Sequence, residues 1–498
     1  MQKIILSLLL ILGFKTFSQG YEIKINIKGN KEDTMYLAKY TFDKQYIVDT
    51  CKKVVNGAVT FKGKRNLDKG VYFLVNKAKV RIFDFFINES SKFTINTDET
   101  DIVKNLKSPD SKENEDFINY IRYITSKNKE FGEIRNQTKG KSKADSIKFM
   151  ADKMKAMNDD VQKFESDFLR SHQGTFIGDV LNLKTEKDAK DVPKAKNGRP
   201  DSVYQYLYYK QHYWDGVNFK DDRLLVTPFF AERLKKYFEK IIIQVPDTII
   251  SEIDKIMNQC VQGSEMNKYL LAYFTPTYES SKIMGFDKVF VHLIDNYIKT
   301  GKAKGVYDES VTMKIIERGE ILKPLLLGSK APDLQMIDTI NAKKVNKMGF
   351  DTAKTSQSVT KLYYDNAQKL SQMYTTLSGV DAKYTILVFW DVDCGHCQTE
   401  IPKLLETYHE LRKKYDVKVF SVYTLQDFEK WRKYIIEKKL DFINIYDPVH
   451  LNNIKTKYDI FSTPVIYLLD RNKVIKAKRL SEDQIPGMIK MFEGLEKK

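Results

Sequence analysis

The sequence has few cysteines, few histidines and no long apolar run beyond its first residues. Its four cysteines are too few to hold 498 residues together as a disulfide scaffold. Past that first run, no window reaches the roughly 18 apolar residues of a membrane-spanning helix. There is also no motif of a known nucleic-acid-binding module. These absences exclude a disulfide-rich mini-domain and an integral membrane protein with several spans, and they disfavour a DNA- or RNA-binding function.

The chain carries more positive than negative charge, with a formal net charge of +17. Its lysines are spread along the whole chain and alternate with acidic residues, which is typical of a solvated basic surface. We therefore expect no polyanion as a specific partner and no nucleic acid. Weak association with an anionic envelope surface stays open.

The first residues have the pattern of a secretory signal peptide. Lys3 precedes an apolar run over residues 4–14, and small residues follow at Thr16 and Ser18. The run has about 11 residues, against the ~20 that a spanning helix needs. We expect a signal peptide over residues 1–18 and a protein secreted across the inner membrane, periplasmic or envelope-associated. The alternative is an uncleaved anchor, and the absence of a cysteine after the run disfavours a lipid anchor.

The remaining pattern predicts a multidomain protein with a small all-β module, a mostly α domain and an α/β domain. Residues 20–103 alternate apolar and polar positions as strands do, with an Asn56-Gly57 hairpin signal. Residues 104–323 have helical spacing, and the aromatic-rich stretch at 202–216 is interpreted as a helix with a bulky buried face. Residues 327–498 alternate strands and helices, with an insertion at about 341–381. Cys51 and Cys260 fall outside this last domain and are interpreted as buried side chains.

The stretch FWDVDCGHCQTEIP carries the chemistry of the C-terminal domain. Cys394 and Cys397 follow an apolar strand and open a helix. A c-type haem would need a histidine after the second cysteine, where Gln398 stands. A closed zinc site takes four protein ligands, and the chain has neither a second CxxC nor paired histidines. A redox dithiol fits best, because the helix N-terminus stabilises the thiolate of the first cysteine.

The CGHC motif and its surroundings resemble the thioredoxin superfamily. The Gly-His dipeptide is the one found in protein disulfide isomerases, and Trp390 falls in the FW that precedes such sites. Pro402 looks like the proline that kinks the active-site helix, and Thr463-Pro464 looks like the cis-proline loop that faces the cysteines. The GSKAPDLQM segment before FW…CxxC is similar to extracytoplasmic thiol-disulfide oxidoreductases of the TlpA/ResA kind.

This resemblance implies a thioredoxin fold for residues 327–498 with a redox-active Cys394–Cys397 disulfide. It implies that the backbone at Thr463 and Pro464 binds an extended substrate segment. Because the ligands of a metal site are missing, we also expect no metal and no other cofactor. The two upstream modules resemble uncharacterised modules fused to such domains in envelope proteins.

Two features depart from the pattern of thioredoxin. Val388 stands where thioredoxin has a buried aspartate, so the proton acceptor for the second cysteine is open, with Glu400 as a candidate. Asp391 and Asp393 crowd the site and disfavour the thiolate, whereas a protonated His396 would favour it. The sequence leaves the direction of electron flow open.

We therefore predict an enzyme, a protein thiol-disulfide oxidoreductase that acts on protein dithiols and disulfides, with a reductase role favoured. A reductase of this kind needs a membrane thiol donor. One alternative is a thioredoxin-fold scaffold or binding protein of the envelope. Another is a peroxiredoxin-like antioxidant enzyme, although peroxiredoxins place a proline and a threonine before the reactive cysteine, and residues 386–393 contain neither. The natural substrate and the oligomeric state stay open.

Overall fold

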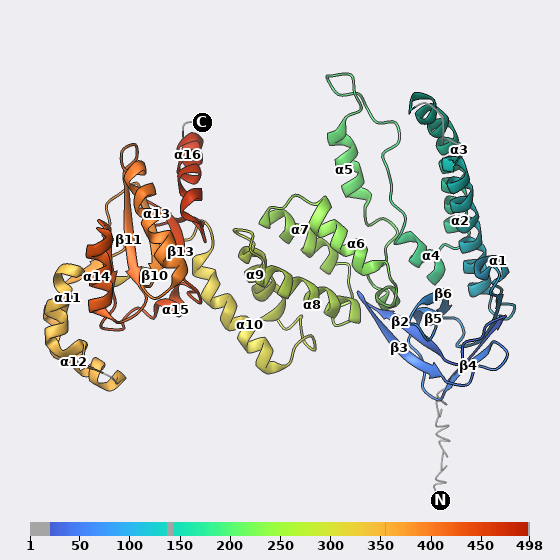
Figure 1. Ribbon diagram of the computed structural model, residues 1–498, viewed down its shortest axis with the longest axis horizontal. Coiled ribbons are helices and arrows are strands. Elements are labelled where there is room, and N and C mark those ends of the chain that lie inside the picture. The colour runs from blue at the N-terminus through green and yellow to red at the C-terminus, as the bar shows by residue number, and fades with distance from the viewer. Residues whose placement is uncertain (1–19, 137–142, 354, 497–498) are drawn as a thin grey trace, which may run out of the picture. The chain divides into compact units, whose positions relative to one another are not determined.

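The computed structural model describes residues 20–136, 143–353 and 355–496. The predicted signal peptide at residues 1–18 lies outside this range. None of the helices in these ranges is long and apolar enough to cross a membrane. The chain divides into two compact units, which are described separately (Figure 1). The first comprises residues 1–244 and 258–266, and the second comprises residues 245–257 and 267–498.

The first unit begins with a two-sheet β module. One sheet has the order β4-β1-β7 and the other the order β3-β2-β5-β6. β1 pairs antiparallel with β4 but parallel with β7. The strands are β1 (Tyr21–Lys28), β2 (Met35–Thr41), β3 (Lys44–Cys51), β4 (Ala58–Gly63), β5 (Gly70–Val75), β6 (Arg81–Ile87) and β7 (Lys92–Asp98).

Apolar side chains from both sheets form the core of this module. The predicted alternation of apolar and polar positions is present in β1, where Ile23, Ile25 and Ile27 are buried. The predicted hairpin signal also forms a turn, in which Asn56 and Gly57 both have positive φ, 50° and 77°. That conformation is the one an Asn-Gly pair adopts at least steric cost. The all-β character predicted for this segment is confirmed, with one parallel strand pair inside it.

Helices follow the β module within the first unit. Aromatic side chains of α2 and α3 pack on one another, with the rings of Tyr123 and Phe164 stacked 3.7 Å apart. The predicted aromatic helix is present as α5. Its residues Val203, Tyr204 and Leu207 are exposed, so the bulky buried face expected there is wrong for these positions. The helices are α1 (Ile102–Asn105), α2 (Lys112–Asn136), α3 (Lys143–Ser171), α4 (Phe176–Asn182), α5 (Ser202–His212), η1 (Asp222–Val226), α6 (Phe230–Lys236) and η2 (Tyr237–Ile241).

The second unit contains several helices that precede the α/β domain in the sequence. The region predicted as one helical domain at 104–323 is thus divided between the two units. Its later helices group with the C-terminal sheet, and α8 does so from its third residue onward. These helices are α7 (Pro246–Met257), α8 (Glu265–Glu279), α9 (Asp287–Leu293), η3 (Ile294–Ile298), α10 (Glu309–Leu322) and η4 (Lys323–Leu325).

A seven-stranded sheet with the order β14-β13-β10-β11-β12-β8-β9 forms the centre of the C-terminal domain. β10, β11 and β12 are parallel, whereas β13 runs antiparallel to β10. β8 pairs antiparallel with β12, and β9 with β8. The strands are β8 (Gln335–Asp338), β9 (Tyr374–Thr376), β10 (Tyr384–Trp390), β11 (Val417–Tyr423), β12 (Ile443–Tyr446), β13 (Val465–Asp470) and β14 (Ile475–Lys478).

The predicted insertion at about 341–381 contains helices and also contributes the edge strand β9 to the sheet. The sequence does not reveal this short strand, because all three of its residues are half-buried and show no alternation of buried and exposed positions. The helices of the domain are α11 (Thr339–Val345), η5 (Asn346–Phe350), α12 (Ser356–Ser371), α13 (Gly395–Leu411), α14 (Phe428–Lys438), α15 (Ile454–Lys457), η6 (Glu482–Gln484) and α16 (Ile485–Glu496).

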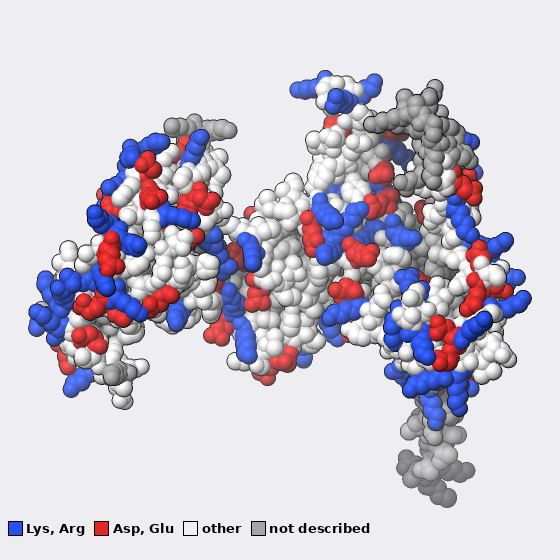
Figure 2. Space-filling model, viewed as in Figure 1, with Lys and Arg blue, Asp and Glu red and all other residues white. Residues whose placement is uncertain are grey.

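Both faces of the sheet are buried, which explains the continuous apolar run of β10. Ile386, Val388 and Trp390 point into a core with α13, α14 and α16. Leu387 and Phe389 point into the opposite core, formed with loop segments and the short α15. The predicted fold class, an all-β module, a helical region and an α/β thioredoxin-like domain, is confirmed. Figure 2 shows basic and acidic side chains interspersed over the visible face, as expected for a solvated basic surface.

Candidate active site

The two cysteines lie where β10 passes into α13. β10 ends at Trp390, and α13 begins at Gly395, so Cys394 occupies the residue directly before the helix. Cys394 has extended backbone angles, and its carbonyl accepts the first helical bond from the Gln398 N–H, 3.0 Å away. The N–H groups of the first helical turn have no partner within the helix, and they favour negative charge at this point.

Cys394 is the half-buried thiol of the pair. Its S–H donates a hydrogen bond to the Thr463 carbonyl oxygen, 3.3 Å away. Burial alone raises the pKa of Cys394. Hydrogen bonding with the Thr463 and Cys397 side chains and with the backbone N–H groups of Cys397 and His396 outweighs burial, so that the pKa of Cys394 lies below its ordinary value. This cysteine therefore forms a thiolate more readily than an unperturbed one.

Cys397 is the opposite case. Its side chain is fully buried in the core under β10. Burial raises the pKa of Cys397 to about 12, although hydrogen bonds from the Asp391 N–H and from Thr463 lower it. The two cysteines of one motif thus differ: the pKa of the accessible thiol is lowered, and the pKa of the buried thiol is raised.

The Thr463–Pro464 peptide bond is cis, and it lies against the cysteines as the resemblance implied. Besides its carbonyl contact to Cys394, the Thr463 side chain donates a hydrogen bond to the Asp391 carboxylate, 2.9 Å away. Residues 69 apart in sequence are therefore joined at the site. The predicted roles of Thr463 and Pro464 in substrate binding stay predictions.

The two aspartates near the dithiol have different environments. Asp391 accepts hydrogen bonds from the Thr463 hydroxyl and from the Asp393 N–H, 2.9 Å away in each case. Asp393 forms an ion pair with Lys430 of α14, with distances of 2.8 and 3.0 Å from the lysine Nζ to its two oxygens. His396 is exposed beside them. Asp391 is thus the acid that faces the sulfurs, while Asp393 turns to a cation.

Trp390 is a buried support for the site rather than a contact to the substrate. Its indole N–H donates to the Ser421 hydroxyl, 2.7 Å away, and both side chains are fully buried. Its ring packs on Tyr434, with centroids 5.4 Å apart. This strand-to-strand hydrogen bond fixes the end of β10 from which the dithiol loop starts.

No acid stands in the position of the buried aspartate of thioredoxin. Val388 is fully buried there, between Ser421 and Ile466 in the sheet. Glu400 does not replace it, because its carboxyl hydrogen-bonds to Glu482, and this bond raises the pKa of Glu400. The sequence-based suggestion of Glu400 as the proton acceptor therefore finds no support in its contacts.

Ligand atoms of Asp391, Cys394 and Cys397 lie within 4.8 Å of one another. This cluster combines one carboxylate and two sulfurs. A closed zinc site takes four protein ligands, and this cluster supplies three. The same proximity places the carboxylate charge beside both sulfurs, where it opposes formation of the thiolate.

Three family models match separate parts of the chain. Residues 21–117 match a domain of unknown function, DUF4369, and residues 153–314 match another, DUF5106. Residues 357–478 match the AhpC/TSA family. That last match spans β10, the dithiol, α13 and the cis-proline loop, all of them in the geometry described above. The chain belongs to the thioredoxin superfamily through its C-terminal domain.

Several solved structures are similar to parts of this chain. One is a domain of a possible thiol-disulfide isomerase from Cytophaga hutchinsonii, which is 36% identical, covers 35% of this chain and 99% of its own, and has a TM-score of 0.27. Another is a thioredoxin-like protein from Bacteroides caccae, with 17% identity, coverage of 60% and 99%, and a TM-score of 0.34. A third, a thiol:disulfide interchange protein from a Bacteroides species, has 24% identity, coverage of 34% and 90%, and a TM-score of 0.25. None of the curated proteins compared with this chain matches it.

The structure brings the predicted residues of the thioredoxin domain together and adds two that the sequence did not reveal. Cys394, Cys397, Asp391 and Thr463 make direct contacts at the site. Lys430, which neutralises Asp393, and Ser421, which holds Trp390, were not expected from the sequence. Nothing in their local pattern identifies them, because each acts across elements that only the fold brings together.

Proposed function

We propose that this protein reduces disulfide bonds of other proteins, with Cys394 as the nucleophile and Cys397 as the resolving thiol. The observation that carries the proposal is the difference between the two cysteines. The pKa of Cys394, at the start of α13, is lowered by hydrogen bonds, whereas burial raises the pKa of Cys397 to about 12. A thiolate attacks a disulfide, and a thiol that stays protonated does not compete for the same attack.

The reaction has two exchanges. The Cys394 thiolate attacks one substrate sulfur, so that a mixed disulfide forms and the other substrate sulfur leaves as a thiolate. Cys397 then loses its proton and attacks the Cys394 sulfur, which releases the second substrate thiol and leaves the Cys394–Cys397 disulfide. Two electrons pass from the protein dithiol to the substrate. The first substrate thiolate accepts the proton that Cys397 loses, so the second substrate sulfur leaves as a thiolate and the proton count balances.

The Asp391 carboxylate supports the reducing direction. It lies within 4.8 Å of both sulfurs, and its negative charge disfavours the thiolate of the reduced form. Destabilising the reduced form makes the dithiol a stronger reductant. The leader-like first residues support a location outside the cytoplasm, periplasmic or at the envelope, where a membrane thiol donor would return two electrons to the disulfide.

The reduction potential of the Cys394–Cys397 couple tests the direction. Equilibration of the full chain with glutathione or dithiothreitol mixtures gives this value. We expect a potential near that of thioredoxin, about −270 mV, whereas a value of about −120 to −180 mV would indicate an oxidase or isomerase and overturn the reductase assignment.

A trapping experiment tests the activity itself. A Cys397→Ala variant, expressed with its leader, is expected to accumulate mixed disulfides with substrate proteins, because the second exchange is blocked. A Cys394→Ala variant is the matched control and should trap nothing. Absence of trapped substrates with unchanged partner binding would favour the scaffold alternative. Consumption of hydroperoxide by the reduced wild type, at a rate above that of disulfide exchange, would favour the peroxiredoxin-like alternative.

A further inference from the structure

A groove beside the cis-proline loop extends the site away from the dithiol. It has a volume of about 360 Å³ and is lined by the loop residues Phe461, Ser462, Pro464 and Val465, by Asp459 and Leu480, and by two arginines, Arg318 and Arg479. Thr463 contacts Cys394 and its two neighbours line the groove, so the groove belongs to the same loop that contacts the reactive cysteine.

One wall of this groove comes from outside the thioredoxin domain. Arg318 lies on α10, before the segment that matches the AhpC/TSA family. Both of its terminal nitrogens hydrogen-bond to the carboxylate of Asp459, with 2.9 Å for the longer bond. Asp459 is almost completely buried, with 2% of its side chain exposed, so this bidentate pair fixes the arginine firmly.

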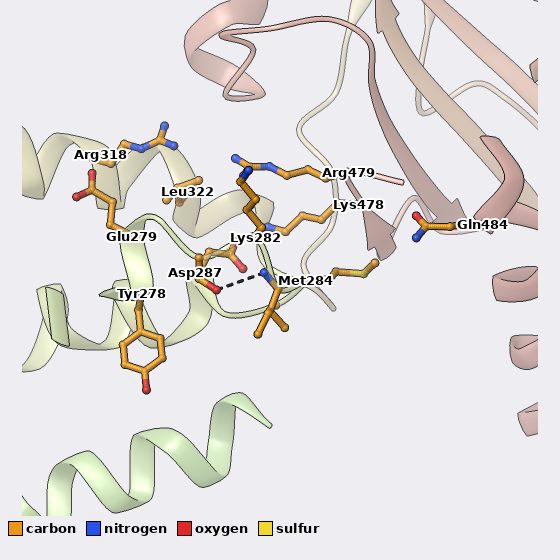
Figure 3. A pocket seen from close by; sticks show the side chains of 13 residues that line it. Tyr278, Glu279, Lys282, Met284, Asp287, Arg318, Leu322, Lys478, Arg479 and Gln484 are labelled. Atoms are coloured by element: carbon orange, nitrogen blue, oxygen red, sulfur yellow. Dashed lines mark hydrogen bonds and ion pairs between the residues drawn. The ribbon is translucent and has the colours of Figure 1, made fainter. Parts of the chain in front are cut away.

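The second arginine supplies the exposed charge. Arg479 donates to the same Asp459 carboxylate, 2.7 Å away, yet 55% of its side chain is exposed. A guanidinium carries five N–H donors, and this hydrogen bond uses one of them. Two arginines share one carboxylate, so the groove has an excess of one positive charge. Figure 3 shows Arg318 and Arg479 pointing toward one another across a second hollow that they both line.

An exposed aromatic ring completes the groove. Phe461 is 78% exposed, although it sits in the loop next to the reactive cysteine. The Arg318 guanidinium carbon lies 5.3 Å from the centroid of this ring, which holds the ring at the groove. Phe461 thus offers an exposed apolar ring next to the charged guanidinium groups of the groove.

We propose that this groove binds the substrate segment next to the disulfide cysteine and selects segments that carry an aspartate or glutamate. The acidic side chain pairs with Arg479 beside Arg318, and a neighbouring apolar side chain packs on Phe461. An extended chain advances about 3.3–3.6 Å per residue, so the acid stands roughly two to four residues from the cysteine. This inference rests on the proposed disulfide exchange and names its substrate class. It also gives α10 a role in substrate selection.

Matched peptides test the selection. Each carries one cysteine linked as a mixed disulfide to thionitrobenzoate and has Glu, Gln or Lys at the flanking positions. The Cys394 thiolate attacks the peptide sulfur, so the S–S bond to thionitrobenzoate breaks and the coloured thiolate leaves. Cys397 then releases the peptide thiol. At low ionic strength we expect the Glu peptide to react about tenfold faster than the Lys peptide, a ratio that falls with salt because the charges are exposed.

Variants assign the effect to the groove. Arg479→Gln keeps the buried Arg318–Asp459 pair and should reduce the Glu-to-Lys ratio to near one. Phe461→Ser should slow all three peptides without changing that ratio. Lys413→Gln removes one charge just after the C-terminal end of α13, where the lysine pairs with Glu410, and should change neither the rates nor the ratio. An unchanged ratio in Arg479→Gln, or equal rates for the wild type with all peptides, overturns the proposal.

Two further measurements separate this inference from the proposed function. Hydroxyethyl disulfide is neutral and small, and both the wild type and the Lys413→Gln control should reduce it at the same rate. If the wild type fails to reduce it, the proposed function has failed. Serine versions of the three peptides cannot exchange, and their binding, measured by fluorescence anisotropy, still tests the groove: tighter binding of the Glu peptide that Arg479→Gln abolishes supports the groove, and equal binding of all three overturns it.

Discussion

The Asp391 carboxylate accepts a hydrogen bond from the Thr463 hydroxyl, 2.9 Å away, and so joins the loop before the dithiol to the cis-proline loop. The same carboxylate lies within 4.8 Å of both sulfurs. Thr463 in turn hydrogen-bonds to Cys394 through its carbonyl oxygen. One acid therefore both positions the two loops and places a negative charge beside the thiolate.

Asp391→Asn should make the dithiol a weaker reductant. The asparagine side chain keeps an oxygen for the Thr463 hydroxyl but removes the charge, so the thiolate is stabilised, the pKa of Cys394 falls and the reduction potential rises. Each 1.4 kcal/mol of added stability in the reduced form raises the potential by about 30 mV. Glutathione equilibration and the ultraviolet absorbance of the thiolate measure the two quantities.

Asp393→Asn is the matched control for this prediction. Its carboxylate is paired with Lys430, and both side chains are 54% exposed, so solvent screens its effect on the sulfurs. The potential of this variant should stay much closer to that of the wild type. Equal shifts in the two variants would contradict the assignment of Asp391 as the acid that acts on the dithiol.

Ser421→Ala should destabilise the thioredoxin domain. The Ser421 hydroxyl is the hydrogen-bond acceptor for the buried Trp390 indole N–H, 2.7 Å away, and alanine leaves that N–H without this partner. Loss of a buried partner costs about 1–3 kcal/mol in the free energy of unfolding. Urea titration followed by fluorescence measures it, and Ser371→Ala, at an exposed hydroxyl on α12, should cost less than about 0.5 kcal/mol.

A double-mutant cycle shows whether the hydrogen bond causes the loss. Trp390→Phe removes the donor, so adding Ser421→Ala to it should cost much less than Ser421→Ala alone. Additive costs would mean that Ser421 acts through packing instead of through the indole N–H.

The sequence predicted those parts of the site whose residues are close together along the chain. An apolar strand, a CxxC and a helical pattern lie within residues 384–411, and their local order sets the geometry of the dithiol. Thr463-Pro464 could be added only through the resemblance to a family. Lys430 and Ser421 could not be predicted, because their roles depend on which strands and helices become neighbours.

The same reason explains why the grouping of the helices into two units differs from the single helical domain expected at 104–323. Helical spacing in residues 104–323 predicts helices, and helices are present, but spacing carries no information on which unit buries their apolar faces. The pair Arg318–Asp459 joins residues 141 apart and illustrates the point. An arginine on an amphipathic helix gives no sign of such a partner, so the grouping of α10 with the thioredoxin domain appears only in the structure.

Glu400→Gln should change how stability depends on pH. A hydrogen bond to Glu482, followed by burial and by the Glu482 charge, raises the pKa of Glu400 above its ordinary value of 4.5. A raised folded-state pKa means that the folded protein binds this proton more tightly than the unfolded chain. The protonated Glu400 therefore contributes fully to the free energy of unfolding below pH 4.5, and this contribution is lost as the pH rises through the folded-state pKa of Glu400.

Urea midpoints measured from pH 4 upward test this sign. The wild type should lose stability over the lower part of the range, and Glu400→Gln should show a flatter profile because glutamine keeps a donor for Glu482 at every pH. Glu410→Gln is a control at the exposed end of the same helix. Pairing with Lys413 lowers the pKa of Glu410, so this variant should not flatten the profile in the same way. If stability fell more steeply with pH in Glu400→Gln than in the wild type, the proposed hydrogen bond from protonated Glu400 to Glu482 would be contradicted.

Asp287→Asn should destabilise the second unit strongly. Asp287 of α9 pairs with Lys478 of β14, whose side chain is only 7% exposed and also donates to the Leu325 carbonyl oxygen. Burial lowers the pKa of Lys478, and the Asp287 charge opposes this shift. Removing the acid leaves a buried ammonium without its counter-ion, which costs about 3–5 kcal/mol in the free energy of unfolding.

Two comparisons isolate the buried charge as the cause. Replacing both partners, Asp287→Leu with Lys478→Met, should cost far less than Asp287→Asn alone, because no charge remains to be desolvated. Asp247→Asn breaks the exposed pair with Lys288 in the same unit and should cost less than about 1 kcal/mol. A double variant as unstable as Asp287→Asn would show that shape, rather than the unpaired ammonium, determines the loss. Because Lys478 and Arg479 are adjacent, the peptide selectivity of the double variant also reports whether this buried pair positions the arginine at the groove.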